Sequence, residues 1–418
     1  MRAAAFRKYI TGANQGYRTK PGNTDAVSPA GKLFNSFTGI ADVPPAMSAK
    51  REKLCLKQIT RPRRGAKRNA RYPSMKSQLK SKLHYYQPSF PRGRAYQLGV
   101  VLRYTTPPVQ TSMAKRGKVQ TWLEYAVARA IFGGLSAMPA SWALTTGQGL
   151  GRVAYVAAGD LKRTGHRNLK LAFPEKTEQE RQQLLRECFA GLGRQLGLFS
   201  KFATSNRESL LDLTRWEGLE QLEAAKAKNK PVILFTGHVG AWELSSFGLS
   251  LREQPLSFLV RRIDNPKVEE LVDRIRMRFG NQSVDKRGAA RPMLNILRTG
   301  GTLGLLVDLN TLDEEAIFVD FFGVPASTTF MLAKLALRTD ATVLPIFVPW
   351  DKDRAKFLVQ ILPEVSVART GDEEADVREL TANLTKVLED YIRRYPDQWL
   401  WIHRRWKTRP KGEPDLYQ

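Results

Sequence analysis

A histidine and a glutamate follow the most apolar predicted strand of the sequence. Residues 231–236 have the sequence Pro-Val-Ile-Leu-Phe-Thr, which is typical of a strand buried on both faces. His238 lies in the loop after this strand, and Glu243 lies in the helix that we expect next. Imidazole titrates near neutral pH, and a neighbouring carboxylate fixes its tautomer and stabilises the imidazolium. The pattern predicts that His238 and Glu243 form a general-base pair that takes a proton from a hydroxyl as it attacks an acyl carbonyl.

Two glycines around the histidine favour a substrate site at this point. Gly237 and Gly240 let the backbone turn tightly and approach a ligand closely. Ligands of open α/β sheets gather at the carboxyl ends of the strands. Backbone N–H groups of residues 237–241, at a helix amino terminus, are candidate donors to a tetrahedral oxyanion. The alternative is a capping histidine followed by a surface glutamate, because this spacing also arises by chance.

Four segments of the chain resemble the late acyltransferases of lipid A biosynthesis. Residues 238–243 match the His-x-x-x-x-Asp/Glu box that these enzymes share with glycerolipid acyltransferases. Residues 166–175, His-Arg-Asn-Leu-Lys-Leu-Ala-Phe-Pro-Glu, are similar to the segment after the family's membrane anchor. Residues 306–310 resemble its Pro-Asp-Gln-Asp box, and residues 396–410 its carboxyl-terminal signature. The resemblance extends from about residue 115 to residue 411 in the family's order and leaves out 1–112.

The resemblance implies a reaction and a set of roles. The family transfers a fatty acyl group from an acyl carrier protein to a hydroxyl of a lipid A precursor or a related glycolipid. By position, His238 is the general base and Glu243 its partner. Arg287 and Arg291 would hold phosphate or sugar oxygens, for which the guanidinium fork is suited, and Asp308 matches the first acid of its box. The alternatives are a solvated helix start for the two arginines and a capping role for Asp308.

The chain departs from the family pattern at two positions, and its other motifs narrow the mechanism. Val307 stands where the family has proline, and Asn310 where it often has a second aspartate, which leaves the exact acceptor open. No Gly-x-Ser-x-Gly motif is present and no cysteine lies near His238, so we expect direct attack by the acceptor hydroxyl rather than an acyl-enzyme. Scattered cysteines and histidines indicate no metal site, and we expect no cofactor.

Strands alternate with helices in the part of the sequence that holds these motifs. This alternation predicts an α/β domain over 161–418 with a largely parallel central sheet flanked by helices. The resemblance implies that this domain is similar to that of the glycerolipid acyltransferases. The expected strands are 231–236, 256–260, 302–307, 342–348 and 356–362. The expected helices are 266–279, 289–298, 328–339 and 373–395.

Residues 113–160 form a second region, which we expect to associate with a membrane. Tyr125 to Leu144 is apolar, with Arg129 as its only charge, and a membrane span needs about 20 apolar residues. Gly133-Gly134 and Pro139 interrupt the segment, which favours an embedded or interfacial helical hairpin over a clean spanning helix. The alternative is a pair of buried amphipathic helices in a soluble domain.

The formal charge of +27 belongs mostly to the first 112 residues. This stretch has 22 Lys and Arg against three acids, so it accounts for +19 of the total. It is rich in proline and shows no apolar period, and we expect a basic, disordered extension. Met113 begins a segment that is typical of a natural amino terminus, so the upstream stretch is either a real extension or a gene-start error.

The charge leaves two other functions to weigh against acyl transfer. A basic arm is also typical of a nucleic-acid-binding protein, and the same general base would serve an acyl-thioester hydrolase. We favour the acyltransferase, acting at the cytoplasmic face of a bacterial inner membrane. Its expected partners are acyl carrier protein, a glycolipid acceptor and an anionic membrane surface, without nucleic acid. The sequence leaves the oligomeric state open.

Overall fold

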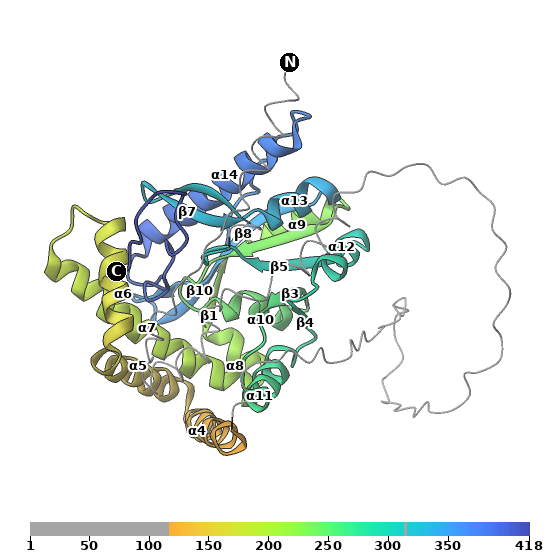
Figure 1. Cartoon of the computed structure of the whole chain (residues 1–418). Helices are drawn as coiled ribbons and strands as arrows, with labels where there is room; N and C mark the ends of the chain where they lie inside the picture. Colours follow the sequence, from red (N-terminus) through yellow and green to blue (C-terminus); the bar gives the residue numbers. More distant parts are fainter. Residues whose placement is uncertain (1–116, 313–315) are drawn as a thin grey trace, which may run out of the picture.

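The computed structural model describes residues 117–312 and 316–418 (Figure 1). The basic extension expected over 1–112 lies outside the described residues. The helices of the described chain are α4 (Lys118–Ala137), α5 (Ala140–Ala157), α6 (Gly159–Ala172), α7 (Glu178–Thr204), α8 (Arg207–Asp212), α9 (Leu219–Ala227), α10 (Glu243–Leu251), α11 (Pro266–Arg276), α12 (Ala290–Arg298), α13 (Met331–Thr339) and α14 (Glu373–Arg394).

The strands form one large sheet and one small one. Their bounds are β1 (Thr214–Glu217), β2 (Val232–Thr236), β3 (Ser257–Val260), β4 (Gln282–Asp285), β5 (Thr302–Leu306), β6 (Ala316–Phe321), β7 (Val324–Thr329), β8 (Thr342–Phe347), β9 (Trp350–Asp351) and β10 (Lys356–Ile361). The large sheet has the order β1-β10-β8-β2-β5-β3-β4, with β9 beside β10. Its neighbours are parallel except that β10 runs antiparallel to β8 and to β9. The expected α/β fold with a largely parallel sheet flanked by helices is confirmed.

Strand β2 lies in the middle of the sheet and is covered on both faces. Ile233 and Phe235 belong to the core that packs against α12, α13 and α14. Val232 and Leu234 point to the other face, into the core shared with α9, α10 and α11. A strand buried on both sides needs apolar residues at every position, which is why its sequence is a continuous apolar run. This burial fixes the end of β2, and with it the loop that holds His238.

The expected elements lie close to their observed positions. Each expected strand ends within one residue of an observed one, and α11, α12 and α14 begin within one residue of their expected starts. The helix expected from residue 328 begins only at Met331. The preceding residues instead form β7, which pairs with β6 in an antiparallel hairpin. The end of β7 is rich in hydroxyl side chains, which are also common at the start of a helix, and this explains the difference.

Helices α4 and α5 pack against the long helix α7 (Figure 1). The chain turns between them at Pro139, whereas Gly133-Gly134 lies inside α4 and does not interrupt it, contrary to expectation. Gly147 of α5 meets Gly193 of α7 so closely that a Cβ on Gly147 would lie 2.3 Å from the Gly193 carbonyl oxygen. In the described part of the chain, no helix has the length and hydropathy to cross a bilayer. Membrane association of 113–160 therefore stays a prediction.

Candidate active site

A histidine and an aspartate meet where two central strands end. His238 follows β2, and Asp308 follows the neighbouring parallel strand β5. The Nδ1 atom of His238 lies 2.8 Å from Oδ1 of Asp308, and the backbone N–H of His238 donates to Oδ2 at 2.6 Å. Gly237 permits this approach, because a Cβ there would lie 3.1 Å from Oδ2 of Asp308 and 2.6 Å from the Leu388 side chain. The parallel pairing of β2 with β5 thus builds a His–Asp pair from residues 70 positions apart.

The pair is buried, and its charge state fixes the tautomer of the imidazole. The Asp308 side chain is 0% exposed and that of His238 is 7% exposed. An ionised carboxylate only accepts hydrogen bonds, so Nδ1 must bear the proton that lies between the two side chains. This leaves Nε2 with its lone pair, and no described residue hydrogen-bonds to it. The geometry therefore presents Nε2 as a base.

Asp308 stays ionised although it is buried. Burial alone would raise its pKa, because a low dielectric disfavours the charged form. The positive charge that His238 can bear, and hydrogen bonds from His238 and Trp399, outweigh burial and lower the pKa of Asp308 to about 2. A permanently charged Asp308 can stabilise an imidazolium on His238 at any physiological pH.

Glu243 does not contact His238, which corrects the expected partnership. Its carboxylate forms a salt bridge with Arg276 of α11, with Nε of Arg276 3.0 Å from Oε2. Burial lowers the pKa of the Arg276 guanidinium, but the charge and hydrogen bonds of Glu243 more than offset this and raise it. Gly240, at φ +58°, turns the chain between the two residues, so Glu243 points to α11 and Asp308 takes the place beside the imidazole.

Four of the five expected oxyanion donors, the amides of residues 238–241, are occupied. The amides of four successive residues after Gly237 all donate within the protein, so they cannot also serve a substrate. Two of these bonds tie the loop to the segments after β8 and after α14, through the isolated bridges of Val239 and Gly240. The acceptors are Asp308 Oδ2 for His238, Gly237 O for Val239, Gln398 O for Gly240 and Val348 O for Ala241. These bonds instead hold the loop rigid around the histidine.

The two arginines expected to bind substrate lie at the carboxyl end of β4. Arg287 is exposed and forms a salt bridge with Asp285, and Arg291 is exposed in the first turn of α12. They occupy the same edge of the sheet as His238, because β4 is parallel to β3 and β3 to β5. No contact joins them to the His–Asp pair within the described chain. Their role stays a prediction.

Trp399, a residue to which the sequence argument gave no role in the pair, completes the site. Its Nε1–H donates to Oδ2 of Asp308 at 2.8 Å, and its carbonyl oxygen accepts from the Cys188 thiol at 3.1 Å. The carbonyl of His238 also accepts from the amide of Leu400, so the carboxyl-terminal segment forms one wall of the site. The tryptophan-rich signature at 396–410 pointed to this segment but not to a hydrogen bond with the aspartate.

The other two resembling segments also meet at this wall. Nδ2 of Asn168, in α6, donates to the carbonyls of Trp401 and His403, each at 2.6 Å. The backbone N–H of Asn310 donates to Nε2 of His403 at 3.0 Å. The segments at 166–175, 306–310 and 396–410, far apart in sequence, therefore support one another and the loop of Asp308.

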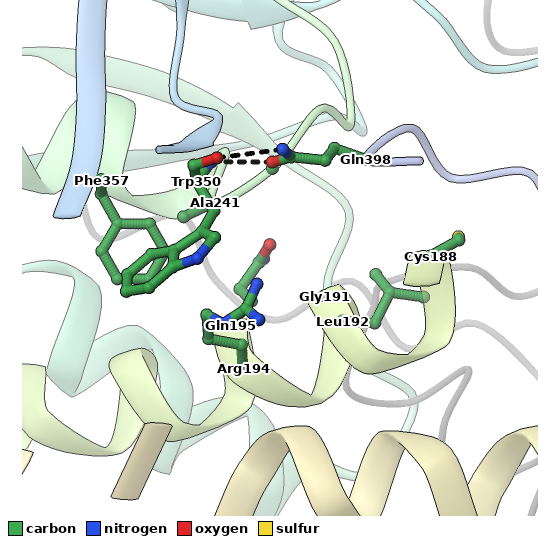
Figure 2. A pocket seen from close by; sticks show the side chains of 10 residues that line it. Cys188, Gly191, Leu192, Arg194, Gln195, Ala241, Trp350, Phe357 and Gln398 are labelled. Carbon is green, nitrogen blue, oxygen red and sulfur yellow. Dashed lines mark hydrogen bonds between the residues drawn. The ribbon is translucent and has the colours of Figure 1, made fainter. Parts of the chain in front are cut away.

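A small cavity is lined in part by Gly240 and Ala241 of the histidine loop (Figure 2). It has about 310 Å³ of space, part of it open to solvent. The Arg194 guanidinium lies 4.6 Å from the centre of the Trp350 indole, and Gln398 exchanges two hydrogen bonds with the Trp350 backbone. His238 and Asp308 do not line this cavity, so it is not where the base faces its substrate. Its lining residues are Cys188, Gly191, Leu192, Arg194, Gln195, Gly240, Ala241, Trp350, Phe357 and Gln398.

No group of three or more His, Cys, Asp or Glu side chains capable of holding a metal occurs in residues 117–312 and 316–418. What the geometry offers is a polarised imidazole at the carboxyl edge of a parallel sheet, close to the Trp242 indole, whose ring centre is 4.8 Å from that of His238. Fold and site together define an α/β protein with a buried His–Asp pair at the carboxyl edge of its sheet, an arrangement suited to general-base chemistry.

Comparison with known proteins narrows this class to a family. The family profile described as bacterial lipid A biosynthesis acyltransferase matches residues 109–408. The chain belongs to this family, as its four resembling segments implied.

Similar proteins are named for lipid A biosynthesis. A lipid A biosynthesis acyltransferase of Haemophilus influenzae is 30% identical over 60% of this chain and 76% of its own. The lipid A biosynthesis lauroyltransferase of Escherichia coli is 30% identical over 65% of this chain and 87% of its own. The lipid A biosynthesis myristoyltransferase of the same organism is 26% identical over 64% of this chain and 82% of its own. These relatives support acyl transfer, and the last two are named for different acyl chains.

Proposed function

We propose that this protein transfers a fatty acyl chain from acyl carrier protein to a hydroxyl of a lipid A precursor or a related glycolipid. Family membership supports acyl transfer to a lipid A-type acceptor. The observation that supports the mechanism is the buried contact of 2.8 Å between His238 and Asp308. In this proposal His238 is the general base and Asp308, rather than Glu243, is its partner.

The proposed reaction is a single displacement at the thioester carbonyl. Nε2 of His238 takes the proton of the acceptor hydroxyl while the hydroxyl oxygen bonds to the carbonyl carbon. Asp308 stabilises the imidazolium. The tetrahedral intermediate then breaks its carbon–sulfur bond, and the leaving thiolate takes the proton from Nε2. The products are an acyl ester on the glycolipid and the free thiol of the carrier protein.

The state of Cys188 supports direct transfer over a cysteine acyl-enzyme. The thiol is buried, and burial raises its pKa to about 12. It also donates a hydrogen bond to the Trp399 carbonyl. A thiol that stays protonated is a poor nucleophile, because the thiolate is the reactive form. We assign Cys188 to the core rather than to the reaction.

The test is acyl transfer by His238→Ala and Asp308→Asn, measured with labelled acyl carrier protein thioesters of several lengths and a panel of glycolipids. General-base help is worth about a hundred- to ten-thousand-fold, so we expect turnover to fall by that amount in His238→Ala. His166→Gln is the matched control, since His166 contacts Glu178 at 3.6 Å and lies outside the site. Product mass identifies both the donor chain and the acceptor.

Two outcomes would contradict the proposal. Full activity of His238→Ala would show that His238 is not the general base. Release of free fatty acid at the full rate without any glycolipid would favour the acyl-thioester hydrolase, in which water replaces the acceptor.

Three charged side chains at the sheet edge are proposed to support this reaction. Arg287 and Arg291, both exposed beyond β4, would bind phosphate or sugar oxygens of the acceptor through their guanidinium forks. Glu243 would act through Arg276, whose guanidinium it holds in place beside the first turn of α10. Raised KM for the glycolipid with little change in kcat in Arg287→Gln and Arg291→Gln would support the binding role.

We also propose that α4 and α5 dock the enzyme on the cytoplasmic face of the inner membrane. Val119, Trp122 and Leu123 of α4 are exposed at helical spacing, and Trp142 of α5 is 68% exposed. Exposed cations accompany them, at Lys118, Arg129 and Arg152. Apolar side chains beside basic ones are typical of helices that lie in an anionic bilayer interface.

Flotation with phosphatidylglycerol vesicles tests the membrane proposal. Trp122→Glu and Trp142→Glu should weaken binding, because each places a carboxylate on the membrane-facing side. Met277→Glu is the control, since Met277 is an exposed apolar residue (40%) on another part of the surface. Equal vesicle binding by all three variants would contradict docking through α4 and α5.

A further inference from the structure

The three tryptophans of the carboxyl-terminal segment have different hydrogen-bond acceptors. Each is almost completely buried. Trp401 donates to the Pro396 carbonyl at 2.6 Å and Trp406 to the Val324 carbonyl at 3.4 Å. Trp399 alone of the three donates to a charged group, Oδ2 of Asp308, at 2.8 Å. A hydrogen bond to a buried carboxylate is roughly twice as strong as one to a neutral carbonyl, so Trp399 has an energetic role that the other two lack.

Trp399 restricts the rotation of the Asp308 carboxylate. Oδ2 accepts from both the Trp399 indole and the His238 amide, at 2.8 and 2.6 Å. Oδ1 is then the oxygen that faces Nδ1 of His238, at 2.8 Å. Rotation of the carboxylate away from this orientation would break both of these charge-assisted hydrogen bonds together with the contact to Nδ1. The indole therefore fixes the plane in which the imidazole is held.

A buried arginine of the same segment bears the opposite charge. Arg405 is 1% exposed, and in the described chain it forms no salt bridge. Its guanidinium donates to the Ser327 carbonyl at 2.6 Å and to the Thr328 hydroxyl, and lies 5.1 Å from the centre of the Phe321 ring. Burial lowers its pKa to about 10, and the negative charge of Asp308 partly offsets this, so it stays charged at neutral pH.

We propose that Trp399 and Arg405 are positioning residues of the reaction, which orient Asp308 and balance its buried charge. The inference rests on the proposed function, because it gives these residues a role only if His238 is the base. Both come from the segment after α14, so in this proposal the segment serves the site through Asp308. Phe321 lies between them, with its ring centre 5.5 Å from that of Trp399.

The proposal determines the direction in which the pH profile should move. The charged groups that act on Asp308 are His238 on the β2 loop and Arg405 on the carboxyl-terminal segment. Cys188 on α7 contacts the Trp399 carbonyl and stays neutral, because burial raises the pKa of its thiol. Loss of the indole N–H makes Asp308 more basic, and a more basic carboxylate favours the imidazolium. Loss of the Arg405 charge acts in the same direction. Either change should raise the pKa of the acidic limb of kcat/KM.

The experiment compares Trp399→Phe with Trp406→Phe. Both keep an aromatic ring and remove one indole N–H from the same segment. We expect Trp399→Phe to lower kcat about tenfold and to move the acidic limb up by about half to one pH unit. Trp406→Phe should leave the pKa of the acidic limb unchanged. This difference should persist even if both variants melt at the same lower temperature.

Arginine variants provide the second measurement. Arg405→Lys retains a cation, so we expect the acidic limb of kcat/KM to have the same pKa as in the wild type. Arg405→Met removes the cation, so we expect this pKa to rise. If Arg405→Met does not fold, the Trp399→Phe profile alone decides. Unchanged limbs in Trp399→Phe would overturn the inference while leaving the proposed function intact, whereas activity of His238→Ala would overturn the proposed function itself.

Discussion

At the residue scale, the ionised state of Asp308 should make the protein sensitive to acid. The pKa of Asp308 falls from an ordinary 3.8 to about 2 in the fold, so the unfolded chain binds the proton more tightly. The resulting stability is fully present above about pH 4 and is lost as the pH falls toward 2. A shift of this size corresponds to about 2 kcal/mol.

Comparison with Asp308→Asn isolates this contribution. Urea unfolding at several pH values should show that the stability gap between wild type and Asp308→Asn narrows as the pH falls from about 4 to 2. A gap that stays constant over this interval would mean that the pKa of Asp308 is the same in the folded and the unfolded chain.

Gly237 is the second residue whose change is predictable. A methyl group at this position would lie 2.6 Å from the Leu388 side chain and 3.1 Å from Asp308. Overpacking of this kind typically costs about 1–3 kcal/mol, and here it also displaces the carboxylate. We expect Gly237→Ala to lower both the melting temperature and kcat.

Gly149→Ala is the control for Gly237→Ala. A Cβ at Gly149, inside α5, meets nothing within 4 Å, so the substitution should stabilise the helix slightly. Wild-type turnover in Gly237→Ala would show that the approach of Asp308 to the loop tolerates displacement.

The sequence singled out His238 but paired it with Glu243, which the structure places against Arg276 instead. His238 was evident because it follows an apolar strand and lies between glycines. Glu243 was chosen because it is near in sequence, yet the turn at Gly240 directs it to Arg276. Asp308 stood out only through the family resemblance, since nothing local shows that β5 lies beside β2. Pairing between strands, rather than spacing along the chain, selects the carboxylate.

At the scale of elements, the contact between α5 and α7 depends on glycine. A Cβ on Gly193 would lie 2.1 Å from the Gly147 carbonyl oxygen, a backbone atom that cannot rotate away. We expect Gly193→Ala to separate the two helices and to lower the melting temperature by several degrees. A Cβ on Gly191, in the same helix, would meet nothing within 4 Å. We therefore expect Gly191→Ala to leave the melting temperature unchanged.

Thermal unfolding followed by circular dichroism compares these two variants. Equal melting temperatures would contradict the close packing of α5 on α7. Loss of vesicle binding in Gly193→Ala alone would also link this packing to the proposed docking of α4 and α5.

Central strands were predictable from the sequence and edge strands were not. The buried strands β2 and β8 are continuous apolar runs, which give a clear signal. Strands β1 and β4 lie at the two ends of the sheet and have the sequences Thr-Arg-Trp-Glu and Gln-Ser-Val-Asp. An edge strand is partly exposed and short, so its residues need no apolar pattern. This physical difference explains why the sequence did not predict β1 and β4.

At the scale of the whole molecule, the site is assembled from distant parts of the chain. The loop after β2, the end of β5 and the segment after α14 meet only because the sheet and α14 bring them together. Sequence motifs identified each part, and the family resemblance supplied their order. The hydrogen bonds that join them depend on side-chain directions, which no periodicity encodes.

The charge distribution leads to a prediction for residues 1–112. This stretch accounts for +19 of the formal +27, whereas the family match covers 109–408 and the His–Asp pair lies far downstream. If acyl transfer is the function, deletion of 1–112 should preserve turnover and vesicle binding through α4 and α5. Binding to heparin or DNA, which depends on phosphate- or sulfate-like charge and on salt, should fall steeply. Loss of turnover in the truncated enzyme, with its melting temperature unchanged, would instead place an essential part of the function in the basic stretch.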